Sequence, residues 1–226
     1  MIQQLPWFLL ALCAAGCLAV PPHLPPPSAG DAKKWEKDIA RFEAADRENP
    51  PPRSGILFIG SSSIRLWKTL AADFPGHPVF NRGFGGSQIA DSLHFADRIV
   101  LPYRPRQIVM FAGSNDINAK KSPEQVLADF IAFRQRVHAS LPDTRITYIA
   151  ITPCEKRWSQ LAEVDAANRL IARYCRSREE LDFIDTRADI LGGDGRPRPE
   201  LFREDQLHLS DAGYSLWTRR VRPYLK

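Results

Sequence analysis

The sequence predicts a three-layer α/β/α fold, in which a doubly wound, five-stranded parallel sheet is covered by helices on both faces. Short apolar segments alternate along the chain with longer segments that carry apolar residues at helical spacing. The short segments are continuously apolar, which is typical of strands buried on both faces. Because crossovers between parallel strands are right-handed, this alternation predicts helices on both sides of one sheet.

The first half of the alternation follows a proline-rich stretch. Asp31 can cap the first expected helix, in which Trp35, Ile39 and Phe42 recur at helical spacing and are expected to pack on the body. The expected elements of this half are a helix at 31–47, a strand at 55–60, a helix at 63–74, a strand at 78–81 and a helix at 87–100.

The second half contains the clearest helix, in which Ser122 can cap the first turn and Pro123 occupies it. Each expected strand of this half is again a short apolar run. The expected elements are strands at 107–113, 145–152 and 181–185, and helices at 122–141, 159–176 and about 210–221.

The N-terminal region is expected to be an export signal at 1–20 and a proline-rich, extended and poorly ordered linker at 21–30, ahead of one domain at 31–226. Residues 7–20 are apolar, uncharged and too few to span a bilayer comfortably. Cys17 ends a stretch that resembles a bacterial lipoprotein signal. We therefore expect a periplasmic, membrane-anchored or secreted protein; plain cleavage and a buried N-terminal helix are the alternatives to lipidation.

The charge and the motif content exclude several classes of function. The net charge of +5 is mildly basic, and the chain holds neither a run of five Lys or Arg residues nor a nucleic-acid-binding motif. No phosphate-binding or dinucleotide-binding glycine motif is complete, and no Cys or His residues have metal-ligand spacing. We expect no cofactor, no metal and no nucleic acid partner.

Two cysteines lie in the expected domain. Cys154 precedes the helix expected at 159–176, and Cys175 lies near the far end of that helix. A helix of about 16 residues spans about 24 Å, whereas a disulfide needs Cα atoms within about 7 Å. The sequence therefore predicts two free thiols.

Polar residues and glycines follow the expected strands, where an α/β fold places its chemistry. The first strand is followed by Gly60-Ser61-Ser62-Ser63, the second by Asn81-Arg82-Gly83-Phe84-Gly85-Gly86-Ser87, and the third by Gly113-Ser114-Asn115-Asp116. The segment Asp205-Gln206-Leu207-His208 precedes the last helix. One such cluster is typical of any turn, but four at one sheet edge indicate a site.

These residue types fit acyl transfer, which needs an activated hydroxyl, a base, a group that orients the base and donors for an oxyanion. The three-residue spacing lets Asp205 reach one nitrogen of His208 and leaves the other for a serine. Gly86 can offer a backbone N–H and Asn115 a side-chain amide. The three consecutive serines leave the choice of nucleophile open on chemistry alone.

The four blocks resemble the SGNH hydrolase superfamily, the GDSL-like lipases and esterases. The stretch 31–226 is similar to its bacterial esterases of the platelet-activating-factor acetylhydrolase type. The resemblance implies a flavodoxin-like SGNH fold, with Ser62 as nucleophile, His208 as base and Asp205 as the residue that orients it. It also implies an oxyanion hole of Gly86, Asn115 and the Ser62 N–H. Position 61 is Ser where the family most often has Asp, so Ser61 and Ser63 remain alternative nucleophiles.

The expected function is hydrolysis of a carboxylic ester through an acyl-Ser62 intermediate, on short-acyl or acetyl esters of a small molecule or a glycan. An acetyl-polysaccharide esterase, a lysophospholipase and a thioesterase are alternatives on the same site. A catalytically silent surface carbohydrate-binding protein is the alternative of another class. Arg82 either binds an anionic substrate group or holds its loop by a salt bridge. Trp158 is either a substrate wall or a core or rim residue, and Asp116 is expected to brace the turn of Asn115.

Overall fold

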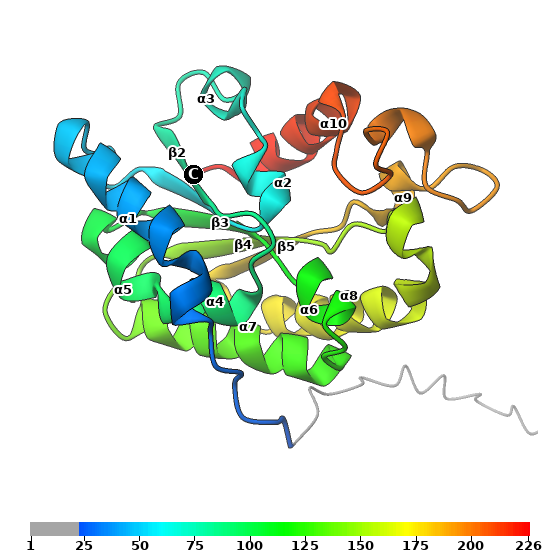
Figure 1. The fold of residues 1–226 in the computed structure, drawn as a ribbon, viewed down its shortest axis with the longest axis horizontal. Helices are drawn as coiled ribbons and strands as arrows, with labels where there is room; N and C mark the ends of the chain where they lie inside the picture. The colour runs from blue at the N-terminus through cyan, green and yellow to red at the C-terminus, as the bar shows by residue number, and fades with distance from the viewer. Residues whose placement is uncertain (1–22) are drawn as a thin grey trace, which may run out of the picture.

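Five parallel strands form a single sheet in the order β2-β1-β3-β4-β5 (Figure 1). The computed structural model describes residues 23–226, so the expected export signal and Cys17 lie outside the described residues. The predicted five-stranded parallel sheet is confirmed. The strands are β1 (Ile56–Gly60), β2 (Val79–Gly83), β3 (Gln107–Phe111), β4 (Arg145–Ile149) and β5 (Leu181–Ile184).

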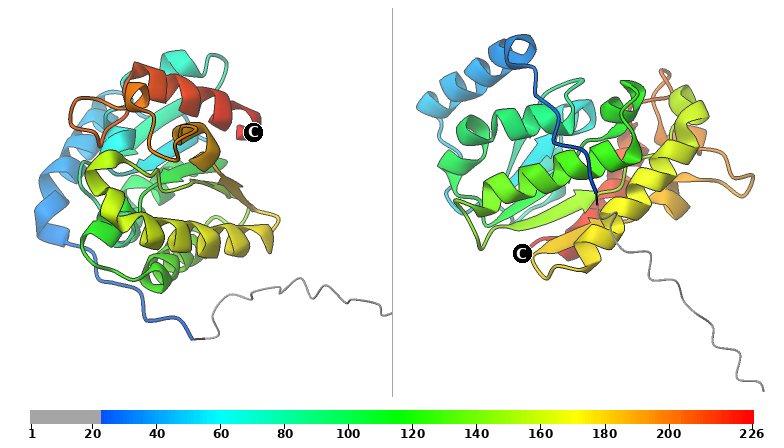
Figure 2. Two further views of the ribbon diagram at one scale, coloured as in Figure 1. Left: turned by 90° about the vertical axis from the view of Figure 1, so that its right-hand side faces the viewer. Right: turned by 90° about the horizontal axis from the view of Figure 1, so that it is seen from below.

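Helices cover both faces of the sheet, as Figures 1 and 2 show. One face is covered by α1 (Ala32–Glu48), α4 (Ile89–His94), α5 (Ala96–Ile99), α7 (Pro123–His138) and α8 (Leu161–Arg176). The other is covered by α2 (Ser62–Arg65), α3 (Leu70–Asp73) and α10 (Asp211–Val221). The shorter helices are α6 (Ser114–Asn118), α9 (Arg187–Ile190), η1 (Leu101–Tyr103), η2 (Glu155–Gln160), η3 (Pro199–Leu201) and η4 (Arg222–Tyr224).

The hydrophobic core is divided into two by the sheet. Leu57 and Ile59 of β1 face the layer of α1, α4, α5, α7 and α8, whereas Ile56 and Phe58 face the layer of α2, α3 and α10. All four side chains are fully buried. Because both faces are covered, both residue sets of a strand are apolar, which is the continuous pattern read in the sequence.

Strand β1 ends level with its neighbours β2 and β3, so the loops that follow these three strands lie together. Gly60 of β1 pairs in register with Gly83 of β2 and with Phe111 of β3. Gly60 has φ +140°, and a Cβ at this position would lie 1.9 Å from the Phe111 carbonyl oxygen. Only glycine fits this close approach, and the approach brings the loop after β1 against the loop after β3.

Four expected helices are shorter or broken in the structure, among them the one expected at 122–141, which is observed as α7 and ends at His138. The helix expected at 63–74 is divided into α2 and α3, and the one expected at 87–100 is divided into α4 and α5. The Leu66 N–H still makes a helical bond to Ser62 O, but the Trp67 N–H donates to Ile64 O and the Lys68 N–H to Leu66 O. A tight turn therefore replaces the helical ladder between α2 and α3. Apolar residues at helical spacing continue through both breaks, so periodicity alone did not show them. The helix expected at 159–176 begins at Leu161, after the short η2.

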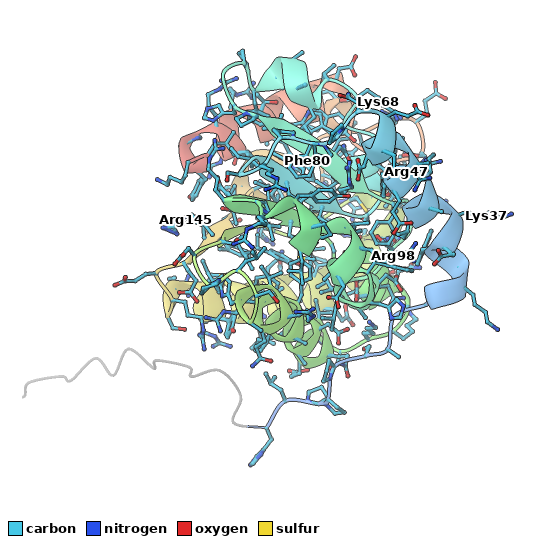
Figure 3. All side chains as sticks on the ribbon, turned by 90° about the vertical axis from the view of Figure 1, so that its left-hand side faces the viewer. Lys37, Arg47, Lys68, Phe80, Arg98 and Arg145 are labelled. Carbon is cyan, nitrogen blue, oxygen red and sulfur yellow. The ribbon has the colours of Figure 1, made fainter. Side chains whose placement is uncertain are left out.

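The N-terminal segment packs on the body. Trp35 and Ile39 of α1 are buried and Phe42 packs against the same core, so the helix packs on the body as predicted. Arg98 of α5 lies against α1 (Figure 3), where it pairs with two glutamates of that helix. Residues 24–30 form no helix or strand. However, the Ser28 N–H donates to a carboxylate of α7, a contact that composition did not predict.

Cys154 and Cys175 are buried free thiols, which confirms the prediction. Burial raises the pKa of both thiols, that of Cys175 to about 12. Within the described residues 23–226, no helix has the length and apolar character needed to cross a membrane.

Candidate active site

Ser62 is the first residue of α2, directly after β1 and one bend residue. The N–H groups of a helix's first turn have no partner inside the helix, and among residues 23–226 the Ser62 N–H donates to no backbone carbonyl. His208 comes from the loop before α10, and Tyr214 of α10 donates its hydroxyl to Ser63 O at 2.8 Å. This contact holds the start of α10 against the start of α2.

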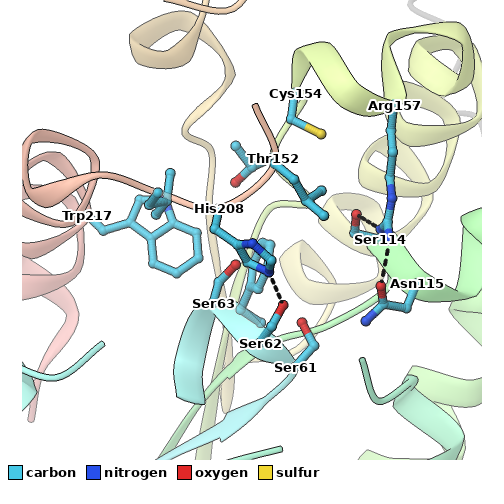
Figure 4. A pocket seen from close by; sticks show the side chains of 13 residues that line it. Ser61, Ser62, Ser63, Ser114, Asn115, Thr152, Cys154, Arg157, His208 and Trp217 are labelled. Atoms are coloured by element: carbon cyan, nitrogen blue, oxygen red, sulfur yellow. Dashed lines mark hydrogen bonds between the residues drawn. The ribbon is translucent and has the colours of Figure 1, made fainter. Parts of the chain in front are cut away.

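Three side chains form a continuous chain of hydrogen bonds (Figure 4 shows the link between Ser62 and His208). His208 Nδ1 lies 2.6 Å from Asp205 Oδ2, and His208 Nε2 lies 2.9 Å from Ser62 Oγ. A carboxylate only accepts, so the proton of a neutral imidazole is on Nδ1. Nε2 is then an acceptor, and the Ser62 hydroxyl donates to it. This is the arrangement that an activated serine needs.

The loop of Asp205 and His208 is fixed by the carboxylate itself. Asp205 Oδ1 accepts the backbone N–H of Leu207 at 3.0 Å and of His208 at 2.9 Å. Although partial burial raises the pKa of Asp205, the hydrogen bonds from the His208 ring and from these two N–H groups outweigh it and lower the pKa to about 2. Asp205 is therefore a carboxylate throughout the neutral and mildly acidic range.

The neighbouring serines are arranged differently. Ser61 and Ser63 are both buried. The Ser61 N–H donates to Phe111 O at 3.1 Å, and the Ser63 carbonyl accepts from Tyr214. Of the three serines, all within the described part of the chain, only Ser62 is hydrogen bonded to His208. The geometry thus favours Ser62 among the alternatives left open by the sequence.

The loops after β2 and β3 meet beside Ser62. The Asn115 amide nitrogen donates to Ser87 O at 3.0 Å, which holds the Asn115 turn next to the Gly86 loop. Gly86 has φ +84°, and a Cβ there would lie 3.3 Å from the Trp35 ring. The structure therefore places Gly86 and Asn115 in adjoining loops, as the sequence motifs imply.

A small cavity lies between Ser62 and His208 and the Asn115 turn (Figure 4). Its volume is about 20 Å³, which is room for a single water-sized group. Its walls are formed by Ser61, Ser62, Ser63, Phe111, Ser114, Asn115, Thr152, Cys154, Arg157, Leu207, His208, Leu209 and Trp217.

Arg157 is a cavity residue that the sequence analysis did not single out. It lies in η2, and its guanidinium donates to Ser114 Oγ at 2.7 Å and to Asn115 Oδ1 at 3.0 Å. A lone arginine in a segment rich in basic residues carries no motif. Its position after the fourth strand, where an α/β fold gathers its functional side chains, was the available signal.

Arg82 and Trp158 do not contribute to the cavity wall. Arg82 is buried, forms a salt bridge with Asp46 of α1 and donates to Tyr103 Oη at 3.2 Å. The structural alternative for Arg82, a salt bridge that holds the loop, is therefore the correct one. Trp158 lies outside the cavity lining, with the Arg196 guanidinium 4.3 Å from its ring centre.

Asp116 was expected to brace the turn of Asn115, and in the structure it links this turn to the start of α4. Its fully buried carboxylate accepts the Ile89 N–H at 3.2 Å and pairs with Lys121 at 3.1 Å. Lys121 also pairs with the buried Asp129 at 2.7 Å. Burial raises the pKa of Asp116 from 3.8 to about 6, against the lowering effect of Lys121 and the Ile89 N–H.

No group of three or more His, Cys, Asp and Glu side chains suited to a metal ion occurs among residues 23–226. The site is instead made of a serine, an imidazole, a carboxylate, an amide and a guanidinium. These groups can transfer a proton, attack a carbonyl carbon and bind a negatively charged oxygen.

Known structures and sequences place this arrangement in a family. A comparison with curated proteins gave no match. The fold is similar to a Streptococcus pneumonia protein assigned as a platelet activating factor, with 24% identity, a TM-score of 0.75, and coverage of 86% of this chain and 94% of that one. It is also similar to a Bacteroides fragilis acylhydrolase, with 17% identity, a TM-score of 0.71, and coverage of 83% and 95%.

A third similar structure is a Geobacillus acetyl-xylooligosaccharide esterase, with 17% identity, a TM-score of 0.61, and coverage of 76% of this chain and 94% of that one. The sequence model of the GDSL-like lipase/acylhydrolase family matches residues 60–216, a span that contains every residue of the hydrogen-bonded chain and both adjoining loops. The protein belongs to this family of ester-hydrolysing enzymes.

Proposed function

We propose that this ester-hydrolysing enzyme acts through an acyl-serine intermediate on short-acyl esters, above all acetyl esters. The observation that carries the proposal is the chain of hydrogen bonds from Asp205 through His208 to Ser62. The small cavity beside Ser62 supports the short acyl group.

In the first half-reaction, Ser62 Oγ attacks the ester carbonyl carbon while its proton passes to His208 Nε2, 2.9 Å away. Asp205 accepts the Nδ1–H bond at 2.6 Å and stabilises the imidazolium that forms. The negatively charged oxygen is bound by the N–H groups of Ser62 and Gly86 and by the Asn115 amide. His208 then donates its proton to the leaving alcohol, and the C–O bond of the ester breaks.

In the second half-reaction, water attacks the acyl carbon and gives its proton to His208 Nε2. The same donors bind the second tetrahedral intermediate, and His208 returns the proton to Ser62 Oγ as the acid leaves. The products are one carboxylic acid and one alcohol, and the enzyme recovers its starting protonation state. Because Asp205 has a pKa of about 2, it remains charged in both half-reactions.

The acyl part of the substrate is limited by the cavity. A volume of about 20 Å³ has room for an acetyl methyl group, and a longer acyl chain directed into the cavity meets buried walls such as Trp217 and Leu209. The similar fold of an acetyl-xylooligosaccharide esterase supports acetylated glycans as the alcohol part. Lysophospholipids and long-chain thioesters fit this cavity poorly.

A catalytically silent carbohydrate-binding protein is the alternative of another class. Binding alone does not require an imidazole placed between a carboxylate and a hydroxyl within 3 Å on both sides. Stoichiometric labelling of Ser62 by a fluorophosphonate supports the enzyme. An unlabelled serine in the folded protein supports the silent binding protein.

The role of Ser62 is tested by p-nitrophenyl acetate hydrolysis with wild type, Ser62→Ala and Ser63→Ala. We expect Ser62→Ala to lower kcat by about 10³-fold or more. Ser63→Ala is the matched control, because Ser63 uses its backbone rather than its hydroxyl to bind Tyr214. Full activity in Ser62→Ala together with loss in Ser63→Ala contradicts the assignment and makes Ser63 the nucleophile.

The acyl selectivity is tested with acetyl, butyryl, octanoyl and palmitoyl esters of one alcohol, beside acetylated xylan. We expect kcat/KM to be highest for acetyl and to fall at each lengthening, because overfilling a packed cavity costs about 1–3 kcal/mol. The measurement is kcat/KM below the micellar range of each ester. A maximum at octanoyl refutes the short-acyl proposal and leaves the serine mechanism intact.

A further inference from the structure

Arg157 places a positive charge on the wall of the cavity. Its side chain is half-buried, and among residues 23–226 its guanidinium is hydrogen bonded to a hydroxyl and an amide oxygen rather than to a carboxylate. Burial lowers the pKa of Arg157. A desolvated cation without a carboxylate partner is costly in a folded protein. This cost indicates that the charge has a function at the cavity wall.

The contact with Asn115 fixes the orientation of an amide. An amide group can be turned over, which exchanges its accepting oxygen and its donating nitrogen. Here the oxygen of Asn115 accepts from Arg157 at 3.0 Å, and the nitrogen donates one of its two hydrogens to Ser87 O at 3.0 Å. A turned amide would present N–H to a guanidinium and oxygen to a carbonyl, and would lose both bonds.

The second hydrogen of the Asn115 nitrogen is left for the substrate. Figure 4 shows the oxygen of Asn115 directed toward Arg157 and the nitrogen directed toward the side of Ser61 and Ser62. A hydrogen bond from a charged donor is stronger than one between neutral groups and polarises the group that accepts it. The Asn115 nitrogen is therefore both aimed and made a better donor by the guanidinium behind it.

The backbone around Arg157 ties this contact to the loop of the base. The Arg157 N–H donates to Cys154 O at 3.2 Å, and the neighbouring Lys156 N–H donates to Gln206 O at 3.1 Å. Gln206 lies between Asp205 and His208 in the chain. The short helix η2 thus contacts the loop of the base through its backbone and the Asn115 turn through a side chain.

We propose that Arg157 is a positioning residue that holds the Asn115 amide in the orientation that binds the oxyanion. This inference rests on the proposed function, since it requires Asn115 to act as an oxyanion donor. Arg157 acts through Asn115 and does not itself contact the reacting atoms. The nearby charge strengthens the donor most when the oxygen becomes negative, so the effect belongs to the transition state.

A double-mutant cycle with p-nitrophenyl acetate tests the inference, using Arg157→Ala, Asn115→Ala and the double variant. We expect Asn115→Ala to lower kcat by about 10²-fold or more. Arg157→Ala is expected to lower kcat by about tenfold or more, with KM within about twofold, because residues in direct contact are strongly coupled. In the Asn115→Ala background, removal of Arg157 is expected to change kcat by less than about twofold.

Several controls keep the test decisive. Arg157→Lys retains the charge and one donor, so we expect it to recover part of the lost kcat. Arg134→Ala removes a comparable half-buried arginine, paired with Glu180 away from the cavity, and is expected to leave kcat unchanged. Thermal unfolding of each variant shows whether it is folded at the assay temperature.

Three results overturn the inference. An equal loss of kcat from Arg157→Ala in both backgrounds shows that Arg157 acts independently of Asn115. A raised KM with unchanged kcat shows that it binds substrate directly. Full activity in Asn115→Ala removes the amide from the oxyanion site altogether. In each case the serine mechanism is judged separately by Ser62→Ala, so the two proposals can fail independently.

Discussion

Two aspartates of the site's sequence motifs have opposite surroundings. The Asp205 side chain is 48% exposed and accepts hydrogen bonds from the His208 ring and from two backbone N–H groups. The Asp116 side chain is fully buried, with one lysine and one backbone N–H as donors. The pKa of Asp205 is lowered to about 2, whereas that of Asp116 is raised to about 6.

The two shifts act on stability in opposite directions. A lowered pKa means that the folded state holds the proton less tightly, so Asp205 stabilises the fold above its ordinary pKa of 3.8 and loses this contribution as the pH falls toward 2. A raised pKa means that the folded state holds the proton more tightly than the unfolded state does. The favourable contribution of protonated Asp116 is complete below pH 3.8 and is lost as the pH rises through about 6.

The difference shows how burial and hydrogen bonding compete at one sheet edge. At Asp205 the donors outweigh desolvation and produce a permanent charge, which the proposed mechanism requires of the group that orients the imidazole. At Asp116 desolvation outweighs the donors, and the carboxylate serves to hold two loops together. Substitution of each aspartate by asparagine, which removes charge and keeps shape, separates these roles.

The largest effect is expected for Asp205→Asn. An asparagine can present an N–H to His208 Nδ1, which moves the ring proton to Nε2 and prevents that nitrogen from accepting the Ser62 proton. We expect kcat to fall by about 10³- to 10⁴-fold with p-nitrophenyl acetate. The asparagine oxygen can still accept the Leu207 and His208 N–H groups, so the loop is expected to stay folded.

Glu204→Gln is the matched control, because it removes the same charge from the adjacent, exposed position. We expect this variant to keep kcat within about threefold of wild type, as surface charges in water interact weakly. If Asp205→Asn retains more than a tenth of the wild-type kcat, which is about 1.4 kcal/mol in barrier height, Asp205 does not orient the base.

The fold followed from the sequence because its signals are local. Each strand of a doubly covered sheet is continuously apolar, and the predicted strands all overlap the observed ones. The helix breaks after Arg65 and at Phe95 were missed because apolar spacing continues through them. Such breaks depend on tertiary contacts, for example the Asn81 amide that donates to the Ile64 carbonyl at 2.6 Å.

The candidate site was predictable where chemistry and spacing coincide, as in the Asp205 and His208 pair. The choice of Ser62 among three serines needed the family resemblance, since three consecutive serines offer the same hydroxyl group and the sequence does not show which one points toward His208. Arg157 and Arg82 could not be ranked from sequence. Their surroundings come from residues distant in the chain: Arg82 pairs with Asp46, whereas Arg157 is hydrogen bonded to the Asn115 turn.

A smaller effect on activity is expected for Asp116→Asn. The asparagine oxygen can still accept the Ile89 N–H, so the two loops should stay together and kcat should fall by less than about tenfold. Stability should respond instead. Wild type loses the stabilising contribution of protonated Asp116 between pH 4 and 6. The asparagine does not titrate, so its contribution to stability does not change over this range. As the pH rises through this range, the free energy of unfolding of the variant should therefore increase relative to that of wild type by up to about 3 kcal/mol.

The measurement is the free energy of unfolding by urea for both proteins at several pH values from 4 to 7. Asp97→Asn is the control, because the Asp97 side chain is 61% exposed and pairs with Arg136 at the surface. Its difference from wild type should stay nearly constant over the same range. A constant difference for Asp116→Asn as well would show that Asp116 is ionised at pH 4, and that Lys121 and the Ile89 N–H outweigh its burial. The two aspartates would then carry the same charge at pH 4, and they would differ only in how much their substitution lowers kcat.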